Sequence, residues 1–407
     1  MSNRKAAIKV VNKLRSRGFK ALLAGGCVRD MLLCRQANDH DVATDARPDD
    51  VIRLFRRTLK VGAKFGVVIV LLQDKQVEVA TFRTEAGYEN GRHPGKIEFS
   101  DAREDAARRD FTVNGMFYDP LEKKVLDFVG GQRDLGNRII RTIGKAEERF
   151  GEDYLRMLRA VRFSTQLGFE IEAKTFAAIR DNAKKITRIS GERICMELEG
   201  ILIDTNRSAG MALLAGIGLA EEIFPGLSAQ QINFAVKVLG HLRKKVDFAL
   251  SLAAVFADCD TGFAVNKFKI LKLSRNQEKH IKYLLANRGR LLDNDMPLAQ
   301  LKMFLAAPCF RDLFELQKAI QKAHFGGRKG IEPLIALRRR IKGLGDVELK
   351  PKPLLNGHEL MGLGASAGPR LGQLSEEMYI EQLEGGLQDK AQAEQWVKKW
   401  LEKHKDM

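Results

Sequence analysis

Long apolar segments are missing from this 407-residue sequence, so we do not expect a membrane protein. The N-terminal stretch from Met1 to Lys20 is basic, but it also lacks a continuous apolar core. Its apolar residues recur at helical spacing, which predicts a first amphipathic helix and not a signal peptide. A mitochondrial targeting sequence is the alternative for this stretch.

Cysteine and tryptophan are scarce, with five and two residues respectively. The number of cysteines is odd, and the sequence has neither a Cys-x-x-Cys pair nor histidines at zinc-ligand spacing, which argues against a structural zinc motif. We therefore expect reduced, unpaired thiols in a cytoplasmic protein. No repeat period is found beyond residue 170, which excludes an array of repeated units.

Acidic residues are outnumbered by basic ones, 52 against 69, and the net charge is +17. Such an excess predicts a polyanionic partner, and nucleic acid is favoured over a membrane surface because no long apolar segment is present. A generally basic soluble protein is the plain alternative. The apolar content of 44% and the length of 407 residues predict a globular protein with two to four domains.

A Gly-Gly pair, Gly25 and Gly26, follows the apolar run Leu22–Ala24. Glycine allows a tight turn and a close backbone approach, and the residues after the pair can begin a helix whose N–H groups face the turn. This pattern indicates a phosphate-binding turn. Ordinary turn chemistry explains an isolated Gly-Gly pair as well.

Asp39 and Asp41 come shortly after this turn and are followed by Val42–Thr44. In a strand, both carboxylates would project from one face. Mg²⁺ binds through one or two carboxylates plus substrate phosphates, so the pair is a candidate metal site. Glu78, in the predicted strand Val77–Phe82, would complete a carboxylate triad if it points the same way. The alternatives are a solvated Asp-x-Asp turn and a glutamate that faces solvent.

The region from residue 20 to about 140 alternates short apolar runs with helical stretches, which predicts a small mixed α/β domain. We expect a helix over Asp49–Leu59 and a strand over Val67–Leu72. Between Arg83 and Phe99 the sequence is polar and predicts a long loop without regular structure, of the kind that is either functional or disordered.

A second polar cluster lies within Ala107–Met116. Arg109 can donate a pair of hydrogen bonds to phosphate, while Asp110 and Asn114 are short polar groups suited to ribose hydroxyls. The alternative is a helix cap with surrounding surface charge.

A third cluster opens a predicted helix near Glu152, with Asp153 and Arg156 as neighbours on one face. A carboxylate accepts from an exocyclic amine, and a guanidinium donates to a ring nitrogen. Together they would therefore accept cytosine and adenine and reject uracil and guanine. An intrahelical salt bridge is the alternative. Arg159 and Arg162 continue the spacing and are assigned to triphosphate or RNA contacts.

The order of these motifs resembles a known family. Gly25-Gly26-x-Val-Arg29-Asp followed by Asp39-x-Asp41 resembles the nucleotidyltransferase signature of the polymerase-β superfamily, in the form used by class II CCA-adding enzymes and bacterial poly(A) polymerases. The cluster around Arg109 is similar to the family's second motif, with Gly115 where the family usually has alanine. Glu-Asp153-x-x-Arg156 resembles its templating motif. Further likenesses are the neck segment Ser190–Ile194 and the tail segments Asn356–Leu360 and Gly368–Gly372.

The resemblance implies an α+β fold, in which a nucleotidyltransferase head with a mixed sheet and helices precedes an all-α neck, body and tail. The expected bounds are 1–140 for the head, 141–200 for the neck with its base-reading helix, 201–345 for an RNA-binding body and 346–407 for the tail. It also implies that residues 83–99 correspond to a flexible loop needed for the final adenosine.

The implied activity is the template-independent addition of CMP and AMP to the tRNA 3′ end from CTP and ATP, without a membrane or an obligate protein partner. Asp39 and Asp41 would hold two Mg²⁺ ions with Glu78 as third carboxylate, and Gly25, Gly26 and Arg29 would bind the triphosphate. The alternatives are an enzyme that adds only the terminal adenosine, a poly(A) polymerase, and an RNA-binding protein with a decayed catalytic site.

Overall fold

The computed structural model describes residues 1–407 except 61, 63–64, 90–92, 328 and 405–407, and it does not describe the side chains of 85–89, 93–96 and 329. The chain forms two compact units. The first comprises Met1–Val236 and Asn266–Leu273, and the second comprises Lys237–Val265 and Ser274–Met407. The expected division into head, neck, body and tail stays a prediction.

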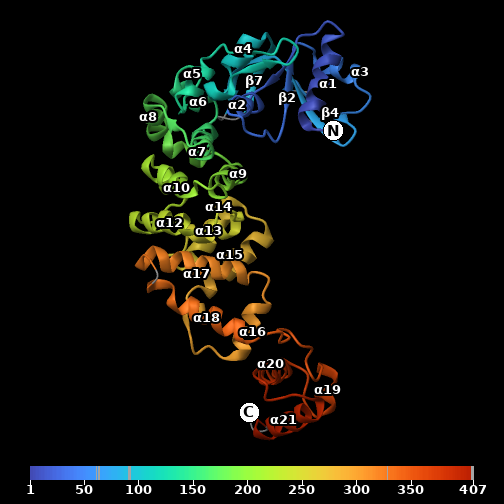
Figure 1. Cartoon of the computed structure of the whole chain (residues 1–407), viewed down its shortest axis with the longest axis vertical. Coiled ribbons are helices and arrows are strands. Elements are labelled where there is room, and N and C mark those ends of the chain that lie inside the picture. Colours follow the sequence, from blue (N-terminus) through green and yellow to red (C-terminus); the bar gives the residue numbers. More distant parts are fainter. Residues whose placement is uncertain (61, 63–64, 90–92, 328, 405–407) are drawn as a thin grey trace. The chain divides into compact units, whose positions relative to one another are not determined.

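A seven-stranded mixed sheet forms the centre of the N-terminal region, drawn in blue to cyan in Figure 1. The strand order is β3-β4-β5-β2-β1-β8-β9. Strands β2 and β5 run parallel, and the other neighbours are antiparallel. With the helices that follow it, this sheet confirms the predicted α+β class. The bounds are β1 (Ala21–Ala24), β2 (Asp41–Thr44), β3 (Thr58–Leu59), β4 (Val67–Leu72), β5 (Lys75–Thr81), β8 (Phe117–Asp119) and β9 (Lys124–Leu126).

One face of this sheet carries a small apolar core. The register pairs Leu22 with Ala43 and Ala43 with Ala80, and alternate residues of a strand share a face. Phe82, Phe117 and the Ala106 side chain of α4 (Ala102–Ala107) pack on this face. The predicted N-terminal helix is confirmed as α1 (Asn3–Arg15). It begins at the capping residue Ser2 and packs a buried apolar stripe against β1, β2 and β5.

The predicted helix over Asp49–Leu59 is wrong in its C-terminal part. Helix α3 covers Pro48–Leu54, and Phe55 has extended backbone angles, φ −114° and ψ 129°. Thr58 then pairs with Val70 of β4. Pairing at the edge of the sheet overrides the local helical pattern.

The expected loop between Arg83 and Phe99 is also wrong as a description of the backbone. Strands β6 (Arg83–Glu89) and β7 (His93–Phe99) form an antiparallel hairpin. The ladder extends from the pair Arg83 and Phe99 to the pair Glu89 and His93. Residues 90–92 of the expected loop lie outside the described residues. The paired strands satisfy backbone groups that a long loop would leave to solvent.

Helices follow the sheet. Helix α6 ends at Glu152 and α7 begins at Leu155, while α9 begins at Gly191, where an added Cβ would lie 1.7 Å from the Ile270 oxygen. Only glycine permits this contact. The remaining elements up to residue 271 are α2 (Gly26–Leu32), η2 (Thr112–Asn114), α5 (Gly131–Gly136), β10 (Ile139–Ile140), α6 (Ala146–Glu152), α7 (Leu155–Leu167), β11 (Glu170–Ile171), α8 (Ala173–Asn182), η3 (Ala183–Arg188), α9 (Gly191–Leu202), α10 (Arg207–Gly216), α11 (Leu219–Ile223), α12 (Ala229–His241) and α14 (Thr261–Leu271).

In its described part, the second unit contains helices and no strand. The sequence predicts a helix over Leu298–Ala323 that is broken near Pro308, and this break is confirmed, because α16 ends at Ala306 and α17 begins at Phe310. The sequence also predicts one helix over Lys269–Arg288, but the structure divides it, and Ser274 caps the start of α15. The helices are α13 (Phe248–Val255), α15 (Arg275–Asn287), η4 (Arg290–Leu292), α16 (Leu298–Ala306), α17 (Phe310–Phe325), η5 (Lys329–Ile331), α18 (Glu332–Gly343), α19 (Gly357–Gly362), α20 (Pro369–Glu384) and α21 (Lys390–Lys403).

The C-terminal helices α19, α20 and α21 enclose their own apolar cluster. Leu360, Met378 and Val397 are fully buried there, and Trp400 is 6% exposed. The indole Nε1 of Trp400 donates to a carboxylate oxygen of Glu377 at 2.6 Å. Trp400 is therefore a packing residue of this cluster. Within the described part of the chain, no helix combines the length and apolar character needed to cross a membrane.

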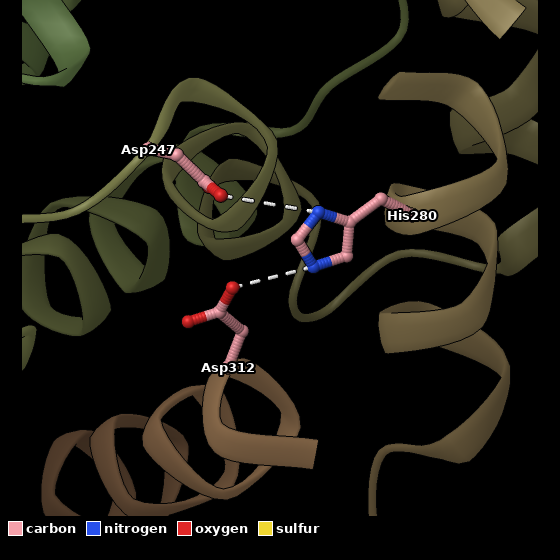
Figure 2. A group of neighbouring side chains, drawn as sticks. All are labelled: Asp247, His280 and Asp312. Carbon is pink, nitrogen blue, oxygen red and sulfur yellow. Dashed lines mark ion pairs between the residues drawn. The ribbon is translucent and has the colours of Figure 1, made fainter. Parts of the chain in front are cut away.

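An ion-pair network joins three helices of the second unit (Figure 2). The imidazole of His280 in α15 lies between two carboxylates, with Nε2 3.4 Å from Asp312 of α17 and Nδ1 3.9 Å from Asp247, which caps α13. The ligand atoms lie within 4.8 Å of one another, a spacing that a metal ion could use, but Arg243 already pairs with Asp312. Asp312, followed by the charge of Asp247, raises the pKa of His280 in spite of its burial.

The stability of the second unit should depend on pH through His280. Since its pKa is raised in the folded protein, the ion pairs contribute fully below the ordinary value of 6.5 and less as pH rises through the folded value. We therefore expect His280→Gln to lower the thermal midpoint more at pH 5.5 than at pH 8.5, measured by calorimetry. His358→Gln, at an exposed position, is the control. A loss that is equal at both pH values would contradict this role.

Candidate active site

A cleft of about 510 Å³ lies on the face of the sheet that carries Ala24, Ala43 and Ala80. These small residues leave room above the strands, and the register pairs Ala43 with Ala80 and Ala24 with Asp41. The charged and polar residues that line the cleft are Arg29, Asp41, Glu78, Arg83, Arg108, Arg109, Asp110, Asn114, Asp153, Arg156, Arg159 and Arg193. Most of the predicted site residues are therefore in one place, whereas Asp39 and Arg162 are not part of this lining.

The predicted glycine turn follows β1 directly. Gly25 has a φ of +74°, a conformation that favours glycine, and its N–H donates to the Met116 oxygen at 3.1 Å. A Cβ at this position would also lie 3.0 Å from Nη1 of Arg109. Helix α2 then begins at Gly26 and carries Arg29 to the cleft, where its guanidinium donates to Oδ1 of Asn114 at 2.7 Å. Arg109 donates to the carbonyl oxygen of the same Asn114 at 3.4 Å, so both arginines are held beside the turn.

The acidic residues meet where β2 and β5 run in parallel. Asp41 is the first residue of β2 and Glu78 lies on β5, and both line the cleft. Asp39 precedes the strand. Burial, followed by the negative charges of Glu78 and Asp39, raises the pKa of Asp41 to about 6, although Arg109 opposes the shift. Crowded carboxylate oxygens of this kind fit a hard divalent cation, whose charge would relieve their repulsion.

A buried carboxylate that the sequence interpretation missed holds two arginines of the cleft. Asp105 in α4 is 1% exposed, and its Oδ1 accepts from Arg108 at 2.7 Å. Its other oxygen, Oδ2, accepts from Nη2 and Nε of Arg109 at 3.0 and 3.2 Å. Burial acts to raise the pKa of Asp105, but the two guanidinium charges lower it overall. The four-residue spacing to Arg109 on a helix was the available signal.

Asp110 and Asn114 are buried and hydrogen-bonded within the protein. Asp110 accepts from Nη2 of Arg159 at 2.6 Å and from the Phe111 N–H at 2.8 Å. Burial would raise the pKa of Asp110, but Arg159 holds it below its usual value. The predicted roles of Asp110 and Asn114 toward ribose, and of Arg159 toward phosphate, stay predictions.

The expectation that Asp153 and Arg156 share one helical face is wrong. Asp153 has extended backbone angles between α6 and α7, and its Oδ1 accepts from the Leu155 N–H at 3.0 Å. The carboxylate thus accepts from the first N–H of α7 and lies ahead of the helix, whose capping residue is Tyr154. Its Oδ2 also accepts from Nη2 of Arg193 in α9 at 2.6 Å. Arg156, on the first turn of α7, pairs with Glu152.

Arg162 faces a carboxylate outside the cleft. Its Nε lies 2.8 Å from Oε2 of Glu197 in α9, and the guanidinium lies 4.6 Å from the centroid of the Phe163 ring. Phe163 lines the cleft and is also approached by Arg29 and Arg159, at 5.3 and 5.2 Å. Arg193, Glu197 and Phe163 were not predicted. The likeness of Ser190–Ile194 to a neck segment was the one signal for Arg193.

Comparisons with known proteins identify the family. Residues 21–141 match the model of the poly A polymerase head domain, and residues 168–231 match that of the probable RNA and SrmB-binding site of polymerase A. The CCA-adding enzyme of Lactobacillus johnsonii is 33% identical over 396 residues, 93% of each chain. That of Staphylococcus aureus is 33% identical over 406 residues, 97% of this chain and 96% of the relative. The chain belongs to the CCA-adding enzyme family.

A solved structure of this family has the same fold over the whole chain. The crystal structure of the Bacillus stearothermophilus CCA-adding enzyme in complex with CTP matches with a TM-score of 0.82 at 28% identity, covering 100% of this chain and 99% of the other. The family inferred from the sequence, and with it the class of nucleotidyltransferases, is thereby confirmed. The roles of individual site residues are predictions.

Replacing Asp105 should destabilise the first unit strongly. Asp105→Asn removes a buried charge that two guanidinium groups share, and we expect a loss of about 3–5 kcal/mol in the free energy of unfolding. Urea unfolding followed by circular dichroism measures it. Glu148→Gln removes an exposed carboxylate that pairs with Lys145, three residues away, as Arg108 is from Asp105. This control should change the free energy of unfolding little. Equal effects of the two variants would contradict the role given to Asp105.

Proposed function

We propose that this chain adds CMP and AMP to the 3′ end of tRNA from CTP and ATP, without a nucleic-acid template. The observation that carries the proposal is a single cleft that contains both a carboxylate cluster, around Asp41 and Glu78, and the base-edge pair Asp153 and Arg156. Membership of the CCA-adding enzyme family supports it. The excess of basic residues is consistent with an RNA substrate. The cytoplasm is the proposed location.

Asp39 and Asp41 are the proposed ligands of Mg²⁺, with Glu78 as the third carboxylate. Bound there, one of two metal ions would lower the pKa of the attacking 3′-hydroxyl and the other would stabilise the pyrophosphate that leaves. The pKa of Asp41, raised by burial and then by the charges of Glu78 and Asp39, supports this assignment. Gly25, Gly26 and Arg29 are proposed to bind the triphosphate, because they border the same cleft.

Arginines of the cleft would position the nucleotide. Arg109 keeps one guanidinium edge on Asp105, which orients its remaining N–H groups. Arg159 is oriented in the same way by Asp110. We propose that both donate to phosphate or ribose oxygens, as does Asn114. Arg162 pairs with Glu197, so its proposed role is contact with RNA or phosphate after exchange of partner.

Asp153 and Arg156 are the proposed base readers. Asp153 would accept from the exocyclic amine of cytosine or adenine, and Arg156 would donate to the neighbouring ring nitrogen. Uracil and guanine present a carbonyl and a ring N–H in these places, so an oxygen would face the Asp153 carboxylate and an N–H would face the Arg156 guanidinium, and neither hydrogen bond could form. The ion pairs of Asp153 with Arg193 and of Arg156 with Glu152 give each reader a defined direction.

Incorporation of labelled CTP and ATP, separately and together, tests the proposed reaction. The acceptors are tRNA ending at the discriminator base, at -C and at -CC, beside an unrelated RNA. Two cytidines followed by one adenosine, with no further addition, is the expected product. Adenosine added only to the -CC end would mean an A-adding enzyme, and long adenosine tails on any RNA would mean a poly(A) polymerase. No incorporation, with RNA bound, would mean an inactive RNA-binding protein.

Asp41→Asn should lower incorporation by about 10³-fold or more, because the metal is expected to supply several kcal/mol of transition-state stabilisation. Binding of tRNA should be largely unchanged, since the residue is assigned to the metal. Rates over a Mg²⁺ titration measure the effect. Asp74→Asn, in the exposed turn between β4 and β5, is the matched control. Incorporation at the rate of the unaltered protein would exclude the metal assignment.

Asp153→Ala should reduce the preference for CTP over UTP. We expect the ratio of their kcat/KM values to fall by roughly 10-fold or more, because the carbonyl oxygen of uracil then no longer faces a carboxylate oxygen. Steady-state rates with each nucleotide on tRNA ending at the discriminator base measure it. Since Asp153 also accepts from the first N–H of α7, thermal melting is compared in parallel. A uniform fall in both rates, with the ratio unchanged, would mean a purely structural residue.

A further inference from the structure

Two exposed phenylalanines stand at the edge of the cleft. Phe65 and Phe99 expose 44% and 45% of their surface. Val67, two residues after Phe65, lines the cleft, and so does Arg83, the residue that pairs with Phe99 across the hairpin of β6 and β7. Neither ring has a role in the site as described above.

These residues are held together by close contacts. Gly66 has a φ of +79°, and a Cβ on it would lie 3.4 Å from Cε1 of Phe99 and 3.6 Å from Nη1 of Arg83. Both side chains therefore pack directly against the glycine backbone. The Arg83 guanidinium also donates to the Phe65 carbonyl oxygen. We call Phe65, Gly66, Arg83 and Phe99 the aromatic rim.

The rim carries positive charge. The guanidinium carbon of Arg47, an exposed residue, lies 5.5 Å from the centroid of the Phe99 ring. Arg83 supplies a second cation within the rim itself. Exposed aromatic rings interleaved with arginines are the composition of surfaces that bind single-stranded nucleic acid, where bases stack on rings and cations meet phosphates.

The position of the rim indicates which part of the substrates it would contact. The base of the incoming nucleotide is assigned to Asp153 and Arg156, at the start of α7. The rim belongs instead to the side of the sheet where β4 adjoins β5, the strand of Glu78, and Val67 pairs there with Ala80. An acceptor RNA must bring its 3′-hydroxyl to the carboxylates, so its last unpaired bases have to lie along one border of the cleft.

We propose that the aromatic rim stacks an unpaired nucleobase near the 3′ end of the acceptor RNA. Stacking is tolerant of base identity, because every base offers a π-face. The rim would therefore hold the acceptor end whether it ends at the discriminator base, at -C or at -CC. This inference rests on the proposed function, since it names the contact that the same reaction makes with its acceptor.

The test combines changes of the protein with changes of the RNA. Phe99→Ala and Phe65→Ala are compared with the unaltered protein on tRNA that carries an abasic nucleotide at each of its last three positions in turn. We expect each variant to raise the KM for intact tRNA by roughly 10-fold, with the KM for CTP and ATP unchanged. When the abasic nucleotide is at the position that stacks, the KM of the unaltered protein for this tRNA should rise by a similar factor. The two alanine variants should then raise that KM little further.

Controls separate stacking from folding. Phe99→Tyr keeps the ring and should restore the KM, whereas Phe99→Leu keeps an apolar side chain and should not. Leu121→Ala changes a residue of similar exposure, 50%, in the turn between β8 and β9 and should leave the KM unchanged. The proposal would be overturned if the alanine variants left the KM for intact tRNA unchanged. It would also be overturned if they raised the KM equally for intact tRNA and for all three abasic tRNAs.

A binding measurement keeps this inference distinct from the proposed function. Fluorescence anisotropy of end-labelled tRNA ending in -CC reports the acceptor contact without catalysis. If the unaltered protein incorporates no nucleotide while Phe99→Ala weakens the binding of intact tRNA more than that of abasic tRNA, this result contradicts the proposed reaction and supports stacking by the aromatic rim. If the unaltered protein incorporates nucleotides and this difference in binding is absent, the proposed stacking is contradicted and the proposed reaction is supported.

Discussion

The parallel pairing of β2 with β5 is the constraint on which the candidate site depends. It brings Asp41 and Glu78 to one face of the sheet, above a floor made of Ala24, Ala43 and Ala80. Larger side chains at the three alanines would fill the space that a triphosphate needs. Burial, followed by the negative charges of Glu78 and Asp39, disfavours the ionised form of Asp41 and raises its pKa.

The arginines of the cleft are oriented before any ligand binds. Arg109 is held by Asp105, Arg159 by Asp110, and Arg29 by Asn114. A flexible guanidinium would lose side-chain entropy on binding, whereas an anchored one has lost it during folding. Asp105 is the most buried of these anchors, which makes it costly to remove and effective as a support. A site assembled in this way favours defined positions for phosphate and base.

Sequence patterns predicted the strands and the glycine turn well, because those depend on neighbouring residues. Leu22–Ala24 before Gly25 and the continuous apolar run Val67–Leu72 are local signals, and β1 and β4 follow them. The hairpin of β6 and β7 was missed because its residues are polar and its strands pair mainly with each other. Asp153 was expected on a helix but lies between α6 and α7, since an acidic residue just before a helix and one in its first turn look alike in sequence.

The sequence by itself determined the family, the order of the motifs and the chemical character of the site residues, because residue types and short spacings can be read directly from it. Only the tertiary structure decided which groups face one another. Asp153 meets Arg193 across 40 positions, and Arg159 meets Asp110 across 49. Such pairs depend on how α7 packs against α9 and against the sheet domain, and no local pattern encodes that packing. The same holds for the aromatic rim, whose two rings come from segments that are distant in the sequence and meet at Gly66 and Arg83.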